Sequence, residues 1–170
     1  MSLMLNEEIK NYIDQQIKQH NHRGFDSARL NLIDIFGTIP ARIHVDSATI
    51  TTTGNTDTYI IAPINGTLIE VDFSGVDALA ANDTNYITFS ITNLGQDGAG
   101  TTALLAATDA NTTKATGGSA ISANTKRSLT LNTTSGNTQV AVGDRLRIRA
   151  AATGTLANTV TFPTYMLRFI

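Results

Sequence analysis

The sequence predicts an all-β domain, a jelly-roll-like β-sandwich, preceded by a short N-terminal α-helix. Charged residues make up only 15% of the chain, and Thr, Asn, Ser and Gly replace them in runs such as residues 51–56. Thr suits a pleated sheet surface, while Gly and Asn suit tight turns. From residue 41 onward, apolar residues recur with period two in about eight or nine short runs separated by turns, which is the pattern of a sandwich or jelly roll.

Length and charge limit the classes of function. The 170 residues allow one domain with a genuine core and a modest appendage. The net charge of −2 provides no basic face for a phosphate backbone, so we expect no nucleic-acid partner. The chain has no cysteine and no apolar run of membrane-spanning length, and no signal peptide is visible. We therefore expect a soluble chain that is made in the cytoplasm and does not bind membranes.

Residues 1–22 are the first predicted segment, a helix for oligomerisation and anchoring. Its apolar stripe follows steps of three and four residues and consists of Leu5, Ile9, Tyr12, Ile13, Gln16 and Ile17. Asn6 can cap the first turn, where Glu7 and Glu8 complement the helix dipole. A lone helix of about 16 residues is marginal in water. It therefore needs a partner, either its own β domain or sister copies in a trimeric coiled coil, for which Ile at core positions is suitable.

Residues 23–39 form a predicted connector arm. Gly24 ends the helix, and the residues from 30 to 35 alternate in a way that fits an extended arm or a single helical turn. Gly37 and Pro40 mark a natural boundary before the next domain. The β-sandwich domain is therefore predicted to comprise residues 40–170.

Within residues 40–170 the predicted strand runs are 43–50, 58–62, 67–73, 86–92, 101–107, 128–131, 145–151 and 160–170. In the third run, strict alternation places Leu68 with Glu70 and Asp72 on one side of the strand. Asn65-Gly66 is a strong hairpin signal, and the glycine-rich residues 95–100 indicate another hairpin turn. Residues 108–124 predict a long polar loop, and Pro163 predicts an edge strand or a bulge.

His20 and His22 are the candidate metal ligands. If the chain is extended there, side chains at positions i and i+2 share a face. Three such pairs in a trimer would point six imidazoles at the threefold axis, which suits an octahedral transition metal such as Ni, Fe or Co better than tetrahedral Zn. The alternative is a polar helix terminus in which both histidines complement the negative end of the dipole.

Catalytic and sugar-binding groups are harder to assign. His44 lies in an alternating run and is expected to be a surface strand residue. The conceivable pairs for glycoside chemistry come from Glu70, Asp72, Asp77 and Asp83. Nothing distinguishes an acid from a base among them, so we expect no enzyme.

Three tyrosines that can stack on a sugar are Tyr59, Tyr86 and Tyr165, with core packing as the alternative. Arg145, Arg147 and Arg149 alternate along one run and predict a solvated or inter-subunit face.

The layout resembles that of bacteriophage virion appendages, which include head fibres, capsid decoration proteins and small tail-fibre subunits. The resemblance rests on the short helix, the Thr/Asn/Gly-rich β domain, the C-terminal run 165–170 and above all the junction His20-Asn21-His22-Arg23-Gly24-Phe25-Asp26-Ser27. It implies a homotrimer in the virion, whose N-terminal segment docks on other capsid or tail proteins or forms the trimer stem. In related fibres, His-x-His pairs can bind metal on the threefold axis, a role that only His20 and His22 match here.

The stem is short and has no repeated shaft, which favours a compact head-fibre or capsid decoration subunit over a long tail fibre. The expected function is therefore structural. The alternative is a receptor-binding tail-fibre module that contacts host-surface glycans. The ligand-binding residues of such a module are unknown from the sequence.

Overall fold

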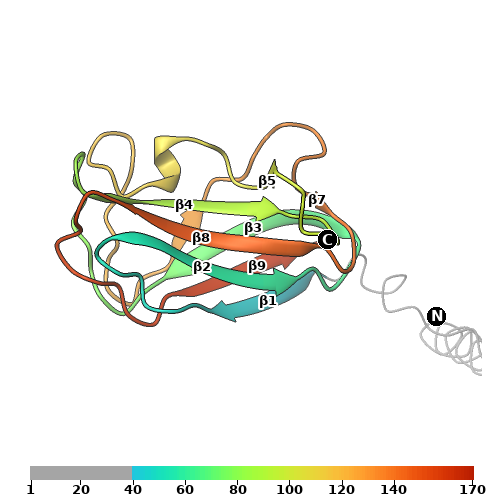
Figure 1. The fold of residues 1–170 in the computed structure, drawn as a ribbon, viewed down its shortest axis with the longest axis horizontal. Helices are drawn as coiled ribbons and strands as arrows, with labels where there is room; N and C mark the ends of the chain where they lie inside the picture. The colour runs from blue at the N-terminus through green and yellow to red at the C-terminus, as the bar shows by residue number, and fades with distance from the viewer. Residues whose placement is uncertain (1–39) are drawn as a thin grey trace, which may run out of the picture. The chain divides into compact units, whose positions relative to one another are not determined.

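The structure is a computed structural model that describes residues 40–170 (Figure 1). The predicted helix with its apolar stripe, the connector, His20 and His22 all lie outside the described residues.

The described residues contain nine strands and one short 3-10 helix. These are β1 (Ala41–Asp46), β2 (Gly54–Ile61), β3 (Gly66–Ser74), β4 (Tyr86–Asn93), β5 (Thr102–Ala103), η1 (Asp109–Asn111), β6 (Arg127–Leu129), β7 (Gln139–Val140), β8 (Arg145–Thr153) and β9 (Thr164–Phe169).

The strands form two antiparallel sheets. Sheet I has the order β1-β9-β3-β6, with β7 also paired to β3, and sheet II has the order β2-β8-β4-β5. The sheets lie face to face (Figure 1). The prediction of an all-β sandwich is confirmed.

The core fills the space between the two sheets. Every second residue of β4 and β8 is buried over most of each strand, for example Leu146, Ile148 and Ala150 of β8. The aromatic centre joins the sheets, because the Phe73 ring of sheet I lies 4.7 Å from the Phe89 ring of sheet II, centroid to centroid, and 5.2 Å from that of Tyr165. Side chains that interdigitate in this way hold the sheets of a sandwich together.

The hairpin predicted at Asn65-Gly66 is wrong, because the strands on either side of it belong to different sheets. β2 pairs with β8 in sheet II, whereas β3 pairs with β9 in sheet I. The Asn65 side-chain oxygen accepts a hydrogen bond from the Val142 backbone N–H at 2.8 Å. A Cβ on Gly66 would overlap the carbonyl oxygen of Ile170. Asn65 and Gly66 therefore lie where the chain crosses from sheet II to sheet I, and not in a hairpin turn. The hairpin at residues 95–100 is confirmed, since β4 and β5 pair across it.

Two further expectations are corrected in sheet I. A β-bulge between Leu68 and Glu70 adds one residue to β3. Leu68 therefore faces the core and is buried, while Glu70 and Asp72 face outward. Pro163 precedes β9, which lies between β1 and β3 and is an interior strand. Proline is tolerated there because it stands outside the ladder.

Candidate functional site

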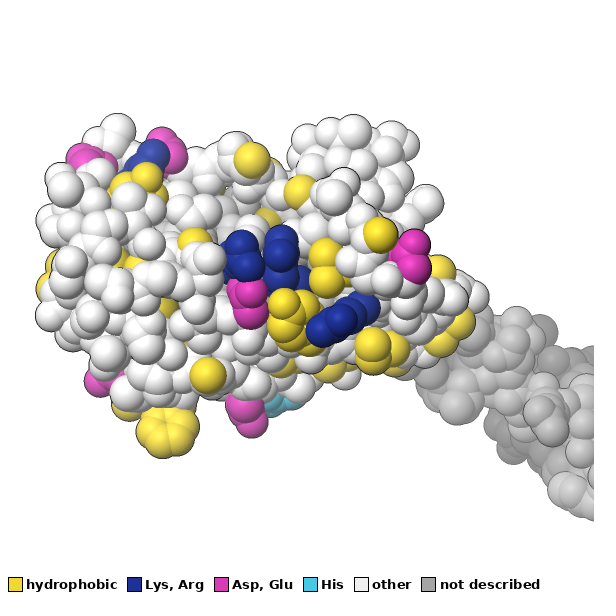
Figure 2. Space-filling model, viewed as in Figure 1, with side chains coloured by type: hydrophobic (Ala, Val, Ile, Leu, Met, Phe, Trp, Pro, Cys, Tyr) yellow, Lys and Arg dark blue, Asp and Glu magenta, His cyan; other side chains and the backbone are white. Residues whose placement is uncertain are grey.

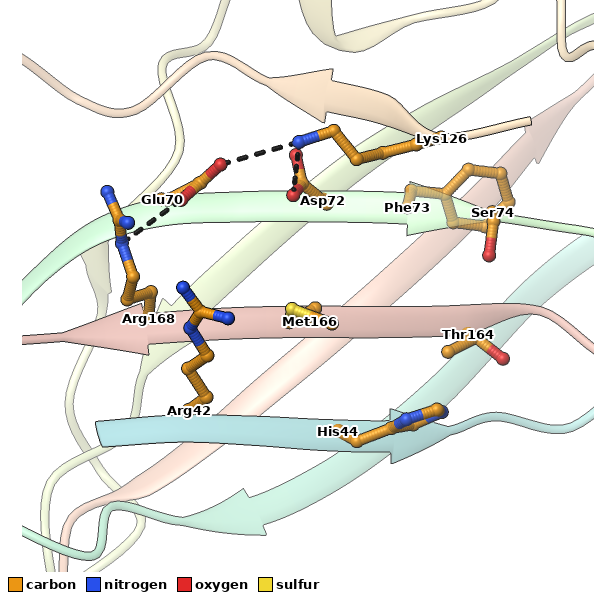
Figure 3. A pocket seen from close by; sticks show the side chains of 10 residues that line it. All are labelled: Arg42, His44, Glu70, Asp72, Phe73, Ser74, Lys126, Thr164, Met166 and Arg168. Atoms are coloured by element: carbon orange, nitrogen blue, oxygen red, sulfur yellow. Dashed lines mark hydrogen bonds and ion pairs between the residues drawn. The ribbon is translucent and has the colours of Figure 1, made fainter. Parts of the chain in front are cut away.

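A groove with a cavity of about 440 Å³ crosses the outer face of sheet I (Figure 3). Its lining residues come from β1, β9, β3 and the segment before β6, and are Arg42, His44, Glu70, Asp72, Phe73, Ser74, Lys126, Thr164, Met166 and Arg168. Strand register brings these distant residues together. Arg168 of β9 pairs with Arg42 on one side and Glu70 on the other. Alternate residues of a strand share a face, so the outward residues of three neighbouring strands line one groove.

Charges of opposite sign alternate along the β3 side of the groove. The Lys126 ammonium lies 2.8 Å from an Asp72 carboxylate oxygen and 3.5 Å from one of Glu70. The Arg168 Nε lies 3.0 Å from the other Glu70 oxygen, without hydrogen-bond geometry. The Ser128 hydroxyl also donates to Asp72 at 2.7 Å. Figure 3 shows the contacts of Lys126 and Arg168 with the two carboxylates along β3.

The pKa values of Asp72 and Lys126 reflect this pairing. Burial of Asp72 opposes its ionisation, but the hydrogen bonds from Lys126 and Ser128 and the lysine charge outweigh burial, so the pKa of Asp72 lies below its ordinary value. The hydrogen bond to Asp72 raises the pKa of Lys126. Both groups are therefore charged at neutral pH, and together they present a fixed pair of opposite charges in the groove.

His44 lies at the other end of the groove. Its Nε2 is 3.1 Å from an Asp46 carboxylate oxygen, which also accepts a hydrogen bond from the Thr164 hydroxyl at 3.2 Å. The side chains of His44 and Asp46 are largely exposed. Water screens such exposed pairs, so this contact adds little to stability.

The other carboxylates considered for glycoside chemistry are held by the loops. Asp77 accepts hydrogen bonds from the backbone N–H and the hydroxyl of Thr161. Asp83 accepts the same two bonds from Thr116, at 2.8 and 3.0 Å. These bonds lower the pKa of both carboxyls. A general acid needs a raised pKa. These two carboxylates are therefore suited to fixing loops and unsuited to protonating a glycosidic oxygen.

The three tyrosines considered for sugar stacking differ in their exposure. Tyr165 is 1% exposed and packs on Phe73, so it cannot contact a sugar. Tyr59 is 46% exposed, and the Arg145 guanidinium carbon lies 4.2 Å from its ring centroid. Tyr86 is half-buried, with the Lys114 ammonium 5.0 Å from its ring centroid. Only Tyr59 and Tyr86 therefore remain as candidate sugar contacts.

The polar loop 108–124 is partly packed into the domain. Asn111 and Thr113 are buried, although the sequence predicts a polar loop. The Asn111 amide donates to two backbone carbonyls at 2.8 Å and accepts the N–H of Thr130 at 2.7 Å. The Thr113 hydroxyl accepts the N–H of Ile87 at 2.8 Å. These polar groups satisfy the backbone of neighbouring segments and are not free to bind a ligand.

Sequence reasoning missed several residues of the groove, namely Arg42, Lys126, Met166 and Arg168. Alternation along residues 164–169 places Met166 and Arg168 on one face, but nothing in the sequence pairs that face with Lys126. Within residues 40–170, no group of three or more His, Cys, Asp or Glu side chains is placed to hold a metal ion. In the same part of the chain, no helix is long and apolar enough to cross a membrane.

Comparison with known proteins gives no family. No protein-family model matches the sequence, and no curated protein matches it. A chain in the "Structure of infectious bursal disease virus Gx strain" matches with 11% sequence identity and a TM-score of 0.38. The match covers 77% of this chain and 32% of that chain. A likeness of this size carries no inference about function.

Proposed function

We propose that the chain is a structural virion protein of a bacteriophage, a homotrimeric head-fibre or capsid decoration subunit that is anchored by its N-terminal segment. The order in which the strands pair is the observation that carries this proposal. The first strand pairs with the last (β1–β9), the second with the next to last (β2–β8), and the inner pairs are β3–β6 and β4–β5. Nested pairs of this kind, folded into a five-stranded and a four-stranded sheet, support a jelly-roll arrangement.

The jelly roll recurs in viral capsid proteins and in lectins. A fold alone does not determine function, so the proposal also uses the way the domain is attached. Ala41 at the start of β1 pairs with Phe169 at the end of β9. The described chain therefore begins and ends at one end of the sandwich.

The groove on sheet I also suits a structural role. It presents fixed charges of both signs around the half-exposed Met166. Charges arranged in this way favour a specific neighbour and a specific orientation at a protein–protein interface. We assign this groove to contact with a neighbouring virion protein.

Analysis of purified phage particles tests the proposal. Particles of the phage that encodes the chain should contain it in a fixed ratio to the major capsid protein, as measured by quantitative mass spectrometry. Deletion of residues 1–22 should remove the chain from particles, while circular dichroism of the purified variant still shows β structure. Absence of the full-length chain from washed particles would contradict the proposal. Loss of the β structure on deletion would contradict the division between anchor and β domain.

The second candidate function is a receptor-binding module that contacts host-surface glycans. The outer face of sheet II supports it, because arginine, tyrosine and hydroxyl side chains line that face together.

A further inference from the structure

Three arginines form a column along the middle of sheet II. Arg145, Arg147 and Arg149 occupy alternate positions of β8 and face outward, while Leu146 and Ile148 between them are buried. β8 lies between β2 and β4, so the column is central to the sheet rather than at an edge. Figure 2 shows dark blue side chains gathered near the middle of this face, with yellow side chains beside them.

The column adjoins a cavity of about 320 Å³. The outward side chains of Tyr86, Thr88 and Ser90 on β4 line this cavity, and residues from the segment 103–114 form its wall. Ser90 of the cavity pairs directly with Arg149 across the β4–β8 ladder, so the cavity and the arginine column are neighbours on this face. On the opposite side, Tyr59 of β2 pairs with Arg147. We call the surface from Thr88 and Ser90 across the three arginines to Tyr59 the trough.

One arginine of the trough is already occupied by a carboxylate. The Nε and Nη2 atoms of Arg149 each donate to one oxygen of Asp57, both at 2.6 Å. This two-pronged contact is the geometry in which a guanidinium binds a carboxylate best. The Arg149 contact therefore shows that a carboxylate fits on this face of the sheet.

The other two arginines have no such partner. Within residues 40–170, no carboxylate forms an ion pair with Arg145 or Arg147. Arg145 lies over the Tyr59 ring, and Arg147 donates only a long hydrogen bond of 3.5 Å to the Thr92 hydroxyl. Two guanidiniums next to each other on one strand face are thus available to a ligand with repeated negative charge. A planar guanidinium is better suited than an ammonium to hold carboxylates.

We propose that the trough binds a linear acidic polysaccharide through the carboxylates of its sugar units. Arg145 and Arg147 bind the carboxylates, and the hydroxyls of Thr88, Ser90 and Thr92 lie where they can hydrogen-bond sugar hydroxyls. Tyr59 provides an exposed apolar surface at one side. The cavity beside the arginine column and the hydroxyl side chains of β4 favour a narrow, hydroxylated ligand over a broad protein surface, whose interface core is depleted in Ser. The proposal names a ligand for the second candidate function and does not depend on the structural role.

Isothermal titration of the full chain with defined polymers tests the proposal. The probes are polygalacturonate, hyaluronate and polysialic acid, with dextran as the neutral control and poly-L-glutamate as the acidic protein control. The chain should bind at least one acidic polysaccharide and should not bind dextran. Removal of the charged contacts in the double variant Arg145→Gln/Arg147→Gln should weaken binding at least about tenfold.

The matched control is Lys10→Gln/Lys18→Gln, which removes two positive charges from residues that belong neither to the trough nor to the groove. It should leave the affinity within about twofold of the wild type, because a contact-specific site responds to the charges that touch the ligand rather than to the net charge of the chain. Tyr59→Ala provides a second variant in the trough, and circular dichroism verifies that each variant is folded.

Three results would overturn the proposal. They are the absence of binding to every polysaccharide, an equal loss of affinity in both double variants, and binding of poly-L-glutamate without any polysaccharide. The last result would identify the trough as a site for an acidic protein segment. None of them affects the proposed structural role, which is tested by the composition of the particles.

Discussion

The packing of Phe73 between the two sheets gives a quantitative test of the fold. Phe73 is 1% exposed and its ring contacts those of Phe89 and Tyr165. Replacement of a buried Phe by Ala removes the transfer free energy of the ring and leaves a cavity, which together cost about 3–5 kcal/mol. A domain of this size is stable by only about 5–15 kcal/mol. Phe73→Ala should therefore destroy a large part of the stability.

Urea denaturation of the full chain, followed by far-UV circular dichroism, measures this loss. With a dependence of about 2 kcal/mol per M urea, the midpoint should fall by about 1.5–2.5 M. The matched control is Phe162→Ala, because Phe162 is 76% exposed. An exposed substitution of this kind changes the free energy of unfolding by no more than about 0.5 kcal/mol.

The comparison between the two phenylalanines decides the result. A loss below about 1 kcal/mol for Phe73→Ala, or equal losses for both variants, would refute the packing described for the core, since cavity formation in a packed core costs more. If Phe73→Ala does not fold at all, Phe73→Leu keeps the test possible. It should produce a smaller loss, but one still larger than that of Phe162→Ala.

Three other predictions follow from the structure and the sequence. Gly66→Ala should lower the free energy of unfolding by about 1–3 kcal/mol, because the new methyl group overlaps a backbone carbonyl; an unchanged urea midpoint would contradict the close approach. Hydrogen bonds from Arg149 lower the pKa of Asp57 below its ordinary value of 3.8. The stabilisation is therefore fully present above that pH and is lost as pH falls through the lowered pKa, so in melts the advantage of wild type over Asp57→Asn should begin to shrink at about pH 4 and should vanish only below the lowered pKa. If His20 and His22 hold a metal in a trimer, elemental analysis should find one transition metal per three chains, and a chelator should lower the melting temperature. The absence of bound metal together with an unchanged melting temperature would refute that hypothesis.

Local patterns in the sequence predicted the strands well. The alternation of Leu146 and Ile148 with three arginines gave β8, and that of Ile87, Phe89 and Ile91 with Thr and Ser gave β4. The reason is that successive side chains of a strand face opposite sides of the sheet. A half-buried strand therefore alternates apolar and polar residues in its sequence.

The failures concern pairing between distant segments. Asn65-Gly66 suggested a hairpin, but the partner of β2 is β8, more than 80 positions along the chain, and the partner of β3 is β9. The bulge between Leu68 and Glu70 inserts one residue, so the side chains of β3 before and after it alternate in opposite phase. A strictly periodic pattern in the sequence cannot reveal such an insertion. A turn signal describes local backbone geometry and does not state which strands pair.

The candidate sites were even less accessible to sequence reasoning. The groove joins Arg42, Asp72, Lys126 and Arg168, which only the order of sheet I brings together. The trough was partly predictable, because alternation placed its three arginines on one face. Its cavity wall was not, because a predicted strand at 101–107 and a predicted loop at 108–124 do not state which strand these segments lie against.

The proposed trimer would form through the N-terminal segment, and the mass of the full-length protein in solution distinguishes a trimer from a single chain. Size-exclusion chromatography with multi-angle light scattering should give three times the chain mass of 18.1 kDa. A variant that lacks residues 1–22 should give the mass of one chain. A full-length protein that elutes at the mass of a single chain over a wide range of concentrations would contradict the account.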